Sequence, residues 1–327
     1  MNNSHEKTWC SFTRPKPYSF MIKIKYGQGH SPLLFIDRLV VKLDFLPGAV
    51  AQQTHSSIFS LFDDPECFSG TKPANSVEIE KKVVLASVPN TKHHPHFTYR
   101  YANHEAHWMR LTLHPRDMDL AGFEDLHSIL GQFTDDGWGS FVSKAKVTQI
   151  EVSIDLEGIP FNSVHILPDQ AQTMTFFKSG QKVETIYIGK SKSNQTVIYD
   201  RAAKRKKLGQ FEKAIPCTRI ERKKTSLNLK VHELGKLTNP FAHVKFVNVP
   251  AAPPPFELKE YLWVLFTDAV AQRGLDPALK LLPQAKRTKY RKYLADQKHS
   301  WWMPDIIWSS WPNVLSSLKL TDPKHWK

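Results

Sequence analysis

The chain has 327 residues, which is long enough for one large domain with a smaller one, or for two domains. Lys and Arg number 45 against 31 Asp and Glu, so the formal net charge is +14. A polyanion, most commonly nucleic acid, is the expected partner, although charge alone does not exclude a membrane surface. Three cysteines without metal-like spacing fit a reducing cytoplasm better than a disulfide framework.

Neither the start of the chain nor its most apolar stretch predicts a membrane span. The first twelve residues are polar and lack the apolar core of a signal peptide. The stretch 261–271 is too short to cross a bilayer and contains Asp268. We therefore expect a cytoplasmic protein.

The first half of the chain alternates strand-like and helix-like patterns. Residues 1–30 predict a tail or a peripheral strand, and 121–137 have helical spacing. Residues 35–45, 107–116 and 147–156 alternate apolar and polar positions, which predicts half-buried strands. The apolar face of the first strand is expected to carry Phe35, Leu39, Val41, Leu43 and Phe45. The apolar face of the third strand, 147–156, is expected to carry Thr148, Ile150, Val152, Ile154 and Leu156.

The second half predicts a hairpin and a separate helical end. A helix is expected near 169–177, then two short strands, a basic helix from Ala202 and a strand from Cys217. The Pro-rich run 249–256 predicts a linker, because it breaks both helix and sheet. Residues 257–327 follow as a small helical domain, and the part after Gly274 contains five of the nine Trp. The expected fold class is α+β: an antiparallel sheet with helices packed on one face, plus this C-terminal domain.

Most of the positive charge lies in one segment. Residues 182–230 contain 14 Lys and Arg but only 4 Asp and Glu, a surplus of ten charges. Several phosphate contacts from such a segment would release counterions, so binding should depend strongly on salt. This segment is therefore the expected electrostatic footprint of a nucleic acid.

Acidic residues on two of the predicted strands are candidate metal ligands. Glu151 and Asp155 share the face opposite to the apolar one, because alternate side chains of a strand share a face. Glu221 is a lone acid among basic neighbours in the strand from Cys217. Carboxylate oxygens suit Mg²⁺ or Mn²⁺. The plainer interpretations are a solvated polar face for the first two and a structural ion pair for Glu221.

Two tyrosines lie on the two predicted hairpin strands, directly before the basic block: Tyr187 and Tyr199. A tyrosine that attacks a phosphodiester must lose a phenolic proton whose ordinary pKa is about 10. Nearby cations favour the phenolate, and a metal ion polarises the phosphate. Tyrosine, carboxylates and Lys or Arg are thus the residue types that this chemistry needs. The plainer alternative is a β-hairpin followed by a solvated basic tail.

The order of "VTQIEVSID", "TIYIGKSKSNQTVIYDRAAKRKK" and "TRIERKK" resembles the replication initiation factors of small rolling-circle plasmids, filamentous phages and some integrative elements. That family shares an acidic strand, a hairpin that ends in Tyr-Asp/Glu-Lys, and a closing Arg-Ile-Glu strand. The resemblance covers about residues 35–226 and fades in the C-terminal part.

Carried over residue by residue, the resemblance implies a nucleophile, metal ligands and DNA contacts. Tyr199 matches the nucleophile, with Tyr187 as a rival because both lie in the matched segment. The implied ligands of Mg²⁺ or Mn²⁺ are Glu151, Asp155 and Glu221. The expected DNA-binding residues are Lys190, Lys192, Ser193, Arg201, Lys204, Arg205, Lys207 and Arg219. Departures from the family pattern, which loosen the expected metal geometry, are Gln149 for Arg, Glu151 for Asp, Lys190 for Ser and Arg201 for Lys.

The resemblance implies that residues 31–248 form a catalytic DNA-nicking domain in a bacterial cytoplasm. The implied reaction is sequence-specific, metal-dependent nicking and rejoining of DNA through a phosphotyrosine intermediate, which starts rolling-circle replication. The implied partners are origin DNA, as duplex and as extruded single strand, a host helicase and polymerase, and a second copy in a homodimer, but no membrane. Two alternatives stay open: a non-catalytic DNA-binding replication repressor, and a conjugative relaxase of an integrative element.

Overall fold

The computed structural model describes residues 22–24, 32–75, 78–88, 94–167, 174–179, 182–190, 194–208, 215–317, 319–322 and 325. Its centre is one antiparallel sheet, in which the short β1 (Ile22–Lys23) pairs with β2. The other strands follow the order β3 (Phe68–Asn75), β4 (Glu78–Val83), β5 (His96–Ala102), β6 (Glu105–Leu113), β2 (Leu33–Asp44), β7 (Lys146–Glu157), β12 (Cys217–Lys230), β11 (Thr196–Asp200), β10 (Lys182–Ile188) and β9 (Met174–Ser179). The predicted α+β class with an antiparallel sheet is confirmed.

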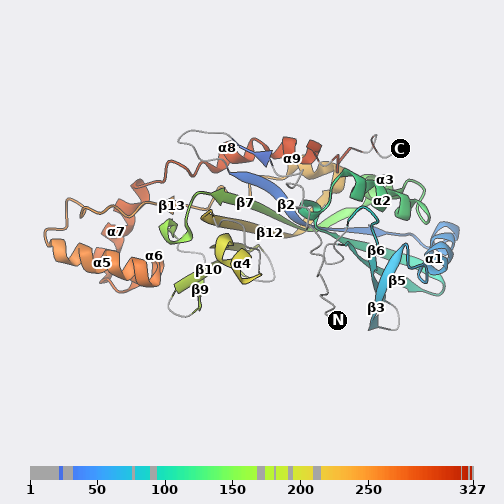
Figure 1. Ribbon diagram of the computed structural model, residues 1–327, viewed down its shortest axis with the longest axis horizontal. Coiled ribbons are helices and arrows are strands. Elements are labelled where there is room, and N and C mark those ends of the chain that lie inside the picture. Colours follow the sequence, from blue (N-terminus) through green and yellow to red (C-terminus); the bar gives the residue numbers. More distant parts are fainter. Residues whose placement is uncertain are drawn as a thin grey trace, which may run out of the picture.

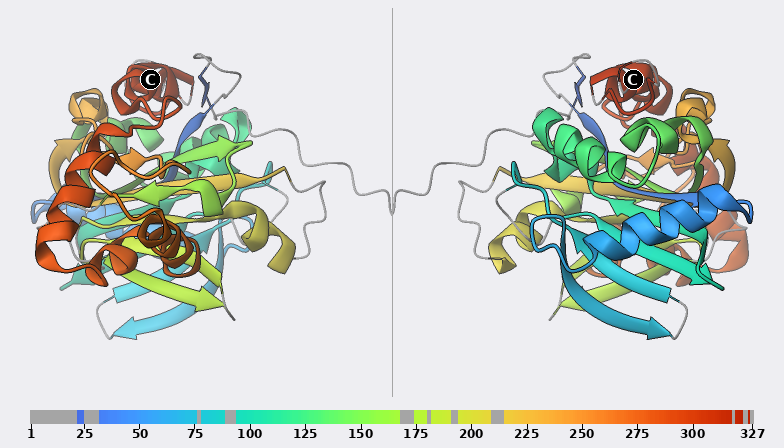
Figure 2. Two further views of the ribbon diagram at one scale, coloured as in Figure 1. Left: turned by 90° about the vertical axis from the view of Figure 1, so that its left-hand side faces the viewer. Right: turned by 90° about the vertical axis from the view of Figure 1, so that its right-hand side faces the viewer.

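Helices cover mainly one face of this sheet (Figure 1). This layer consists of α1 (Ala49–Leu61), α2 (Leu120–Gly131), α3 (Gly137–Lys144), the 3₁₀ helix η3 (Val231–Lys236) and α9 (Trp311–Ser317). Within it, α1 runs along one end of the sheet and packs on β6 (Figure 2). The short α4 (Arg201–Lys207) instead lies against β12 on the opposite face. That second face is therefore the more open one near the middle of the sheet.

The predicted amphipathic helix within 121–137 is confirmed as α2. Its N-cap is Asp119, whose carboxylate accepts a hydrogen bond from the backbone N–H of Gly122. The stripe that faces the sheet is buried, as the helical spacing predicts; it consists of Phe123, Leu126, Ile129, Leu130 and, just beyond the helix, Phe133.

The face assignment of β2 differs from the prediction at one residue. Pairing with β7 shifts between Ile36 and Arg38, so Asp37 is the extra residue of a β-bulge. Ile36 lies in the core on one side of the bulge and Leu39 on the other, whereas Phe35 is buried on the opposite face. The prediction that Phe35 shares a face with Leu39 is therefore wrong, because a bulge reverses the alternation of side chains along a strand.

The face assignment of β7 holds for four of its five predicted core residues. Ile150, Val152, Ile154 and Leu156 are buried in the main core. Thr148 is only half-buried, because the register with β2 shifts there. Its hydroxyl donates a hydrogen bond to the carbonyl of Val40 at 3.1 Å. This second bulge removes Thr148 from the core.

The hairpin that carries both tyrosines forms as predicted from β10 and β11. Its turn requires Gly189, which has φ of 89° and whose added Cβ would lie 2.7 Å from the carbonyl oxygen of Asn194. Asp200 then ends β11 and caps α4 by accepting from the N–H of Ala203. The predicted helix near 169–177 is wrong for its last part, because β9 pairs there with β10 as an edge strand; its first part lies outside the described residues.

The C-terminal helices belong to two different cores. One contains α5 (Glu260–Arg273), α6 (Leu275–Lys280) and α7 (Gln284–Asp296), which lie at the far end of the molecule from α1 (Figure 1). By contrast, α8 (Pro304–Trp308), α9 and the segment just before them belong to the main core, to which they contribute Trp302, Ile307 and Trp311. A boundary at 257–327 would thus divide residues that pack together, and the domain limits stay a prediction.

Buried tryptophans are anchored by hydrogen bonds to the main domain. Trp302 Nε1 donates to the carbonyl of Val244 at 2.8 Å, and Trp311 Nε1 to that of Leu234 at 2.9 Å. The small ribbon of β8 (His165–Ile166) and β13 (Phe246–Val247) joins the two cores, since Phe246 packs in the main core and Val247 in the second. The remaining elements are the 3₁₀ turns η1 (Pro115–Asp117) and η2 (Phe161–Ser163).

In the described part of the chain, no helix combines the length and the apolar character needed to cross a bilayer.

Candidate active site

A row of charged and polar side chains crosses the open face of the sheet at β7, β12 and β11. Arg219 pairs with Asp155 on one side and with Tyr199 on the other in the strand register. Directly paired residues of neighbouring strands point to the same face, so these three side chains stand together. Glu221 lies two residues beyond Arg219 and joins the same face.

Tyr199 and Glu221 form a short hydrogen-bonded pair in this site. The hydroxyl of Tyr199 donates a hydrogen bond to Glu221 Oε1 at 2.6 Å. Burial raises the pKa of Tyr199, which is only 5% exposed, so the phenol stays protonated at neutral pH. Burial, and then the charge of Asp37, raise the pKa of Glu221. A hydroxyl held against a carboxylate of raised pKa is the arrangement of a nucleophile with its base.

Asp155 and Arg219 form a fully buried ion pair beside the tyrosine. Arg219 Nε and Nη2 reach the two carboxylate oxygens of Asp155 at 2.5 and 2.7 Å, and both side chains are 1% exposed. Burial alone would lower the pKa of Arg219, but the hydrogen bond and the charge of Asp155 raise it. The guanidinium also lies 4.9 Å from the ring centre of Phe35, the residue that the bulge turns to this face. Arg219 is thus a structural part of the site and not an exposed DNA contact.

The three predicted metal ligands share this face, but they have separate partners. Asp155 is bound by Arg219, and Glu221 by Tyr199. Glu151 accepts a hydrogen bond from Gln149 Nε2 at 2.7 Å, and burial raises its pKa. In the described residues, no three His, Cys, Asp or Glu side chains are grouped closely enough to hold a metal ion.

These carboxylates therefore do not fit Mg²⁺ or Mn²⁺ in the arrangement seen here. A requirement for either ion stays a prediction, which chelation with EDTA tests. Undiminished DNA cleavage in EDTA would contradict it.

Two residues of the site were not predicted: Asp37 and Arg116. Arg116 follows β6 in η1, and its Nη1 lies 2.6 Å from Asp37 Oδ1. Asp37 reaches this face only because it is the bulged residue of β2. The alternation of apolar and polar residues along 35–45 predicts a regular strand, and no residue type in that range indicates a bulge. Only strand pairing could have revealed these two residues.

The predicted DNA-binding residues of α4 fall into two groups. Lys204 is exposed; its Nζ lies 4.5 Å from the ring centre of Tyr199 and 3.4 Å from its hydroxyl. Lys207 is paired with Glu184 at 2.5 Å, and Arg205 is half-buried. Arg201, by contrast, is 8% exposed. The helix therefore presents Lys204 to solvent above the tyrosine and buries Arg201 beside it.

The hairpin turn is described only in part. Lys190 is exposed, whereas Lys192 and Ser193 lie outside the described residues. The rival nucleophile Tyr187 is half-buried on the same face as Tyr199, opposite Val197. Val197 in turn pairs with Glu221, so Tyr187 stands two strands from that carboxylate and Tyr199 only one. The geometry favours Tyr199.

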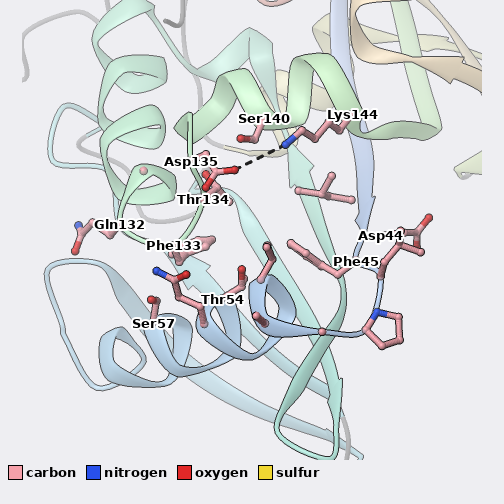
Figure 3. A pocket seen from close by; sticks show the side chains of 18 residues that line it. Asp44, Phe45, Thr54, Ser57, Gln132, Phe133, Thr134, Asp135, Ser140 and Lys144 are labelled. Carbon is pink, nitrogen blue, oxygen red and sulfur yellow. Dashed lines mark ion pairs between the residues drawn. The ribbon is translucent and has the colours of Figure 1, made fainter.

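A separate cavity of about 620 Å³ lies between β2, α1 and the connection from α2 to α3 (Figure 3). Its walls carry Asp44, Thr54 and Ser140, and an ion pair of 3.9 Å joins Asp135 and Lys144 across it. Tyr199 does not line this cavity. The tyrosine site is therefore separate from this cavity.

No protein-family profile matches the chain. No curated protein matches it either. Among solved structures, the chain is similar to a rolling circle replication initiator protein from Geobacillus stearothermophilus, with 11% identity and a TM-score of 0.36, over 75% of this chain and 98% of that chain. A likeness at this level carries no functional argument, so function rests on the side chains described above.

Proposed function

We propose that the chain is a DNA-nicking enzyme that starts rolling-circle replication, with Tyr199 as its nucleophile. The observation that carries this proposal is the hydrogen bond from Tyr199 to Glu221, set among the cations of Lys204 and Arg219. Attack on a phosphodiester needs three things: a tyrosine as nucleophile, a base that takes its proton, and positive charge near the phosphate. The sequence resemblance over residues 35–226 supports the same reading.

The proposed reaction transfers a phosphodiester bond from DNA to protein. As Tyr199 Oη attacks phosphorus, its proton passes to Glu221 Oε1, which already accepts that proton's hydrogen bond. The bond between phosphorus and the 3′ oxygen breaks, and the 3′ oxygen takes a proton from solvent. The products are a 5′-phosphotyrosyl link and a free 3′-OH for a polymerase. Because the number of phosphodiester bonds is conserved, the strand can be rejoined without an external energy source.

Access to the hydroxyl is controlled by Lys204. The tyrosine is 5% exposed, and the Lys204 ammonium lies over its ring, while the Glu221 side chain keeps 19% of its surface in contact with solvent. Lysine is a flexible point charge, so an incoming phosphate can draw this ammonium from the ring to itself. Lys204 is then both the cover of the free site and a contact to the bound strand.

The test is a covalent adduct. Purified protein is incubated with supercoiled DNA that carries the origin region, with Mg²⁺ or Mn²⁺, and the adduct is mapped by mass spectrometry. We expect a link at Tyr199 that Tyr199→Phe abolishes and Tyr187→Phe retains. If the Tyr187 variant alone loses the adduct, the two tyrosines exchange roles.

A non-catalytic DNA-binding repressor is the second candidate. The observation in its favour is that Asp155 is bound by Arg219 and that Tyr199 is almost fully buried. Specific origin binding without any adduct under all metal conditions would establish it. A conjugative relaxase uses the same chemistry as the nickase, so the neighbouring genes distinguish those two.

A further inference from the structure

Arg201 is a buried cation without a described partner. It begins α4, is 8% exposed, and makes no hydrogen bond or ion pair with any residue that the structure describes. Its Nε is enclosed and makes no hydrogen bond to any residue that the structure describes. Burial, and then the nearby Arg219, lower the pKa of Arg201.

The other arginines around Tyr199 differ from Arg201 in this respect. Arg219 is held by Asp155, and Arg116 by Asp37 and Asp117. Arg219 and Arg116 act on Arg201 as further positive charge, and of the nearby carboxylates Asp155, which attracts Arg201, is already bound by Arg219. The site thus holds one guanidinium more than its described ion pairs account for.

An unpaired buried charge is costly. Such a charge has lost its interactions with water and gains no compensating interaction in the protein. A guanidinium has planar N–H donors that match the oxygens of a phosphate. A phosphodiester would supply a negative charge for this guanidinium.

We propose that Arg201 binds the scissile phosphate itself, beside the hydroxyl of Tyr199. This inference rests on the proposed function. It gives Arg201 a different role from the exposed lysines of α4, which would contact other phosphates of the DNA strand. In this role Arg201 neutralises the two non-bridging oxygens while Tyr199 attacks. It is a catalytic residue, since it touches the reacting phosphate.

The first experiment needs no DNA. Thermal unfolding of the full chain is followed in inorganic phosphate and in chloride at equal ionic strength, for wild type, Arg201→Met and Lys206→Met. Lys206 is an exposed residue of the same helix and serves as the matched control. Bound phosphate stabilises the folded state in proportion to its occupancy.

We expect phosphate to raise the unfolding midpoint of wild type and of Lys206→Met by the same amount, and to have little effect on Arg201→Met. In chloride, Arg201→Met should unfold at the same or a higher temperature than wild type, because an uncompensated charge is gone. Equal phosphate shifts in all three proteins would overturn the proposal. Should Arg201→Met fail to fold, Arg201→Gln takes its place with the same expected absence of a phosphate shift.

The second experiment uses the nicking reaction. Removal of a charge-stabilising donor commonly costs about 10²–10³-fold in rate, so Arg201→Met should slow adduct formation by that order. An oligonucleotide with an uncharged methylphosphonate at the nicked position should restore much of this loss, because there is no charge left to neutralise. A variant that is slowed equally on both substrates would contradict the proposal. If wild type forms no adduct with any DNA, the proposed function fails, while the phosphate shift still decides whether Arg201 binds this anion.

Discussion

The two faces of β7, β12 and β11 are both buried at their centre but are stabilised in different ways. One face packs Ile154, Ile220 and Ile198 into the apolar core, and the other buries Asp155, Arg219 and Tyr199. A buried apolar side chain loses little stability when a neighbour is replaced by another apolar residue of similar volume. A buried charge, by contrast, depends on one particular partner of opposite charge. The difference shows that the charged face is maintained at a cost in stability, as expected of a site that acts on a charged ligand.

The largest expected effect is on the reaction. Tyr199→Phe removes the attacking oxygen, so it should abolish the covalent adduct and leave duplex binding nearly unchanged. The same change removes the hydrogen bond to Glu221 and should lower the free energy of unfolding by only about 1 kcal/mol. Adduct formation on gels and urea unfolding measure the two effects. Loss of the fold itself would mean that Tyr199 is a core residue and no more.

The next largest effect is on the free energy of unfolding, and it distinguishes the charged face from the apolar face. Asp155→Asn leaves Arg219 buried without its carboxylate and should cost about 3–5 kcal/mol in the free energy of unfolding. Ile154→Val, one residue away on the apolar face, should cost only about 0.5–1.5 kcal/mol. Replacing both charges, as Asp155→Leu with Arg219→Met, should recover most of the loss. Equal losses for Asp155→Asn and Ile154→Val would remove the proposed difference between the faces.

The pH dependence tests Glu221. Its ordinary pKa is 4.5, and burial raises the pKa in the folded protein. Its contribution to stability is therefore fully present below pH 4.5 and is lost as the pH rises through the raised value. Glu221→Gln should unfold with the same free energy as wild type at low pH and become the more stable protein toward neutral pH. Adduct formation by wild type should rise over the same range, since only the ionised carboxylate accepts a proton. Parallel stability curves would contradict the raised pKa.

The smallest expected effect concerns the exposed side of α4. Replacing Lys204, Arg205 and Lys207 with Gln should weaken binding to all DNA sequences alike, because phosphate contacts carry no sequence information. The plot of log affinity against log salt should flatten by about 0.9 per lost contact. Lys207 should contribute least of the three, since it is already paired with Glu184. A change in sequence preference with an unaltered salt slope would mean that these side chains contact base edges.

The sequence by itself determined the strands β2, β6, β7 and β12, the hairpin and the face of β7 that carries the site. Alternation in 147–156 put Glu151 and Asp155 on the face that the structure shows, because a strand repeats every two residues whatever surrounds it. Local capping and turn residues, Asp200 and Gly189, then set the hairpin and the start of α4.

Only the tertiary structure decided which of these charges meet. Pairing of β2 with β7 created the bulge that brings Asp37 and Phe35 to the site, and the joining of β7 to β12 bound Asp155 to Arg219. The same packing buried Arg201 and gave α8 and α9 to the main core. These contacts join residues that lie far apart in the chain. Which residues meet depends on strand register and on burial, and a local sequence pattern contains no information about either.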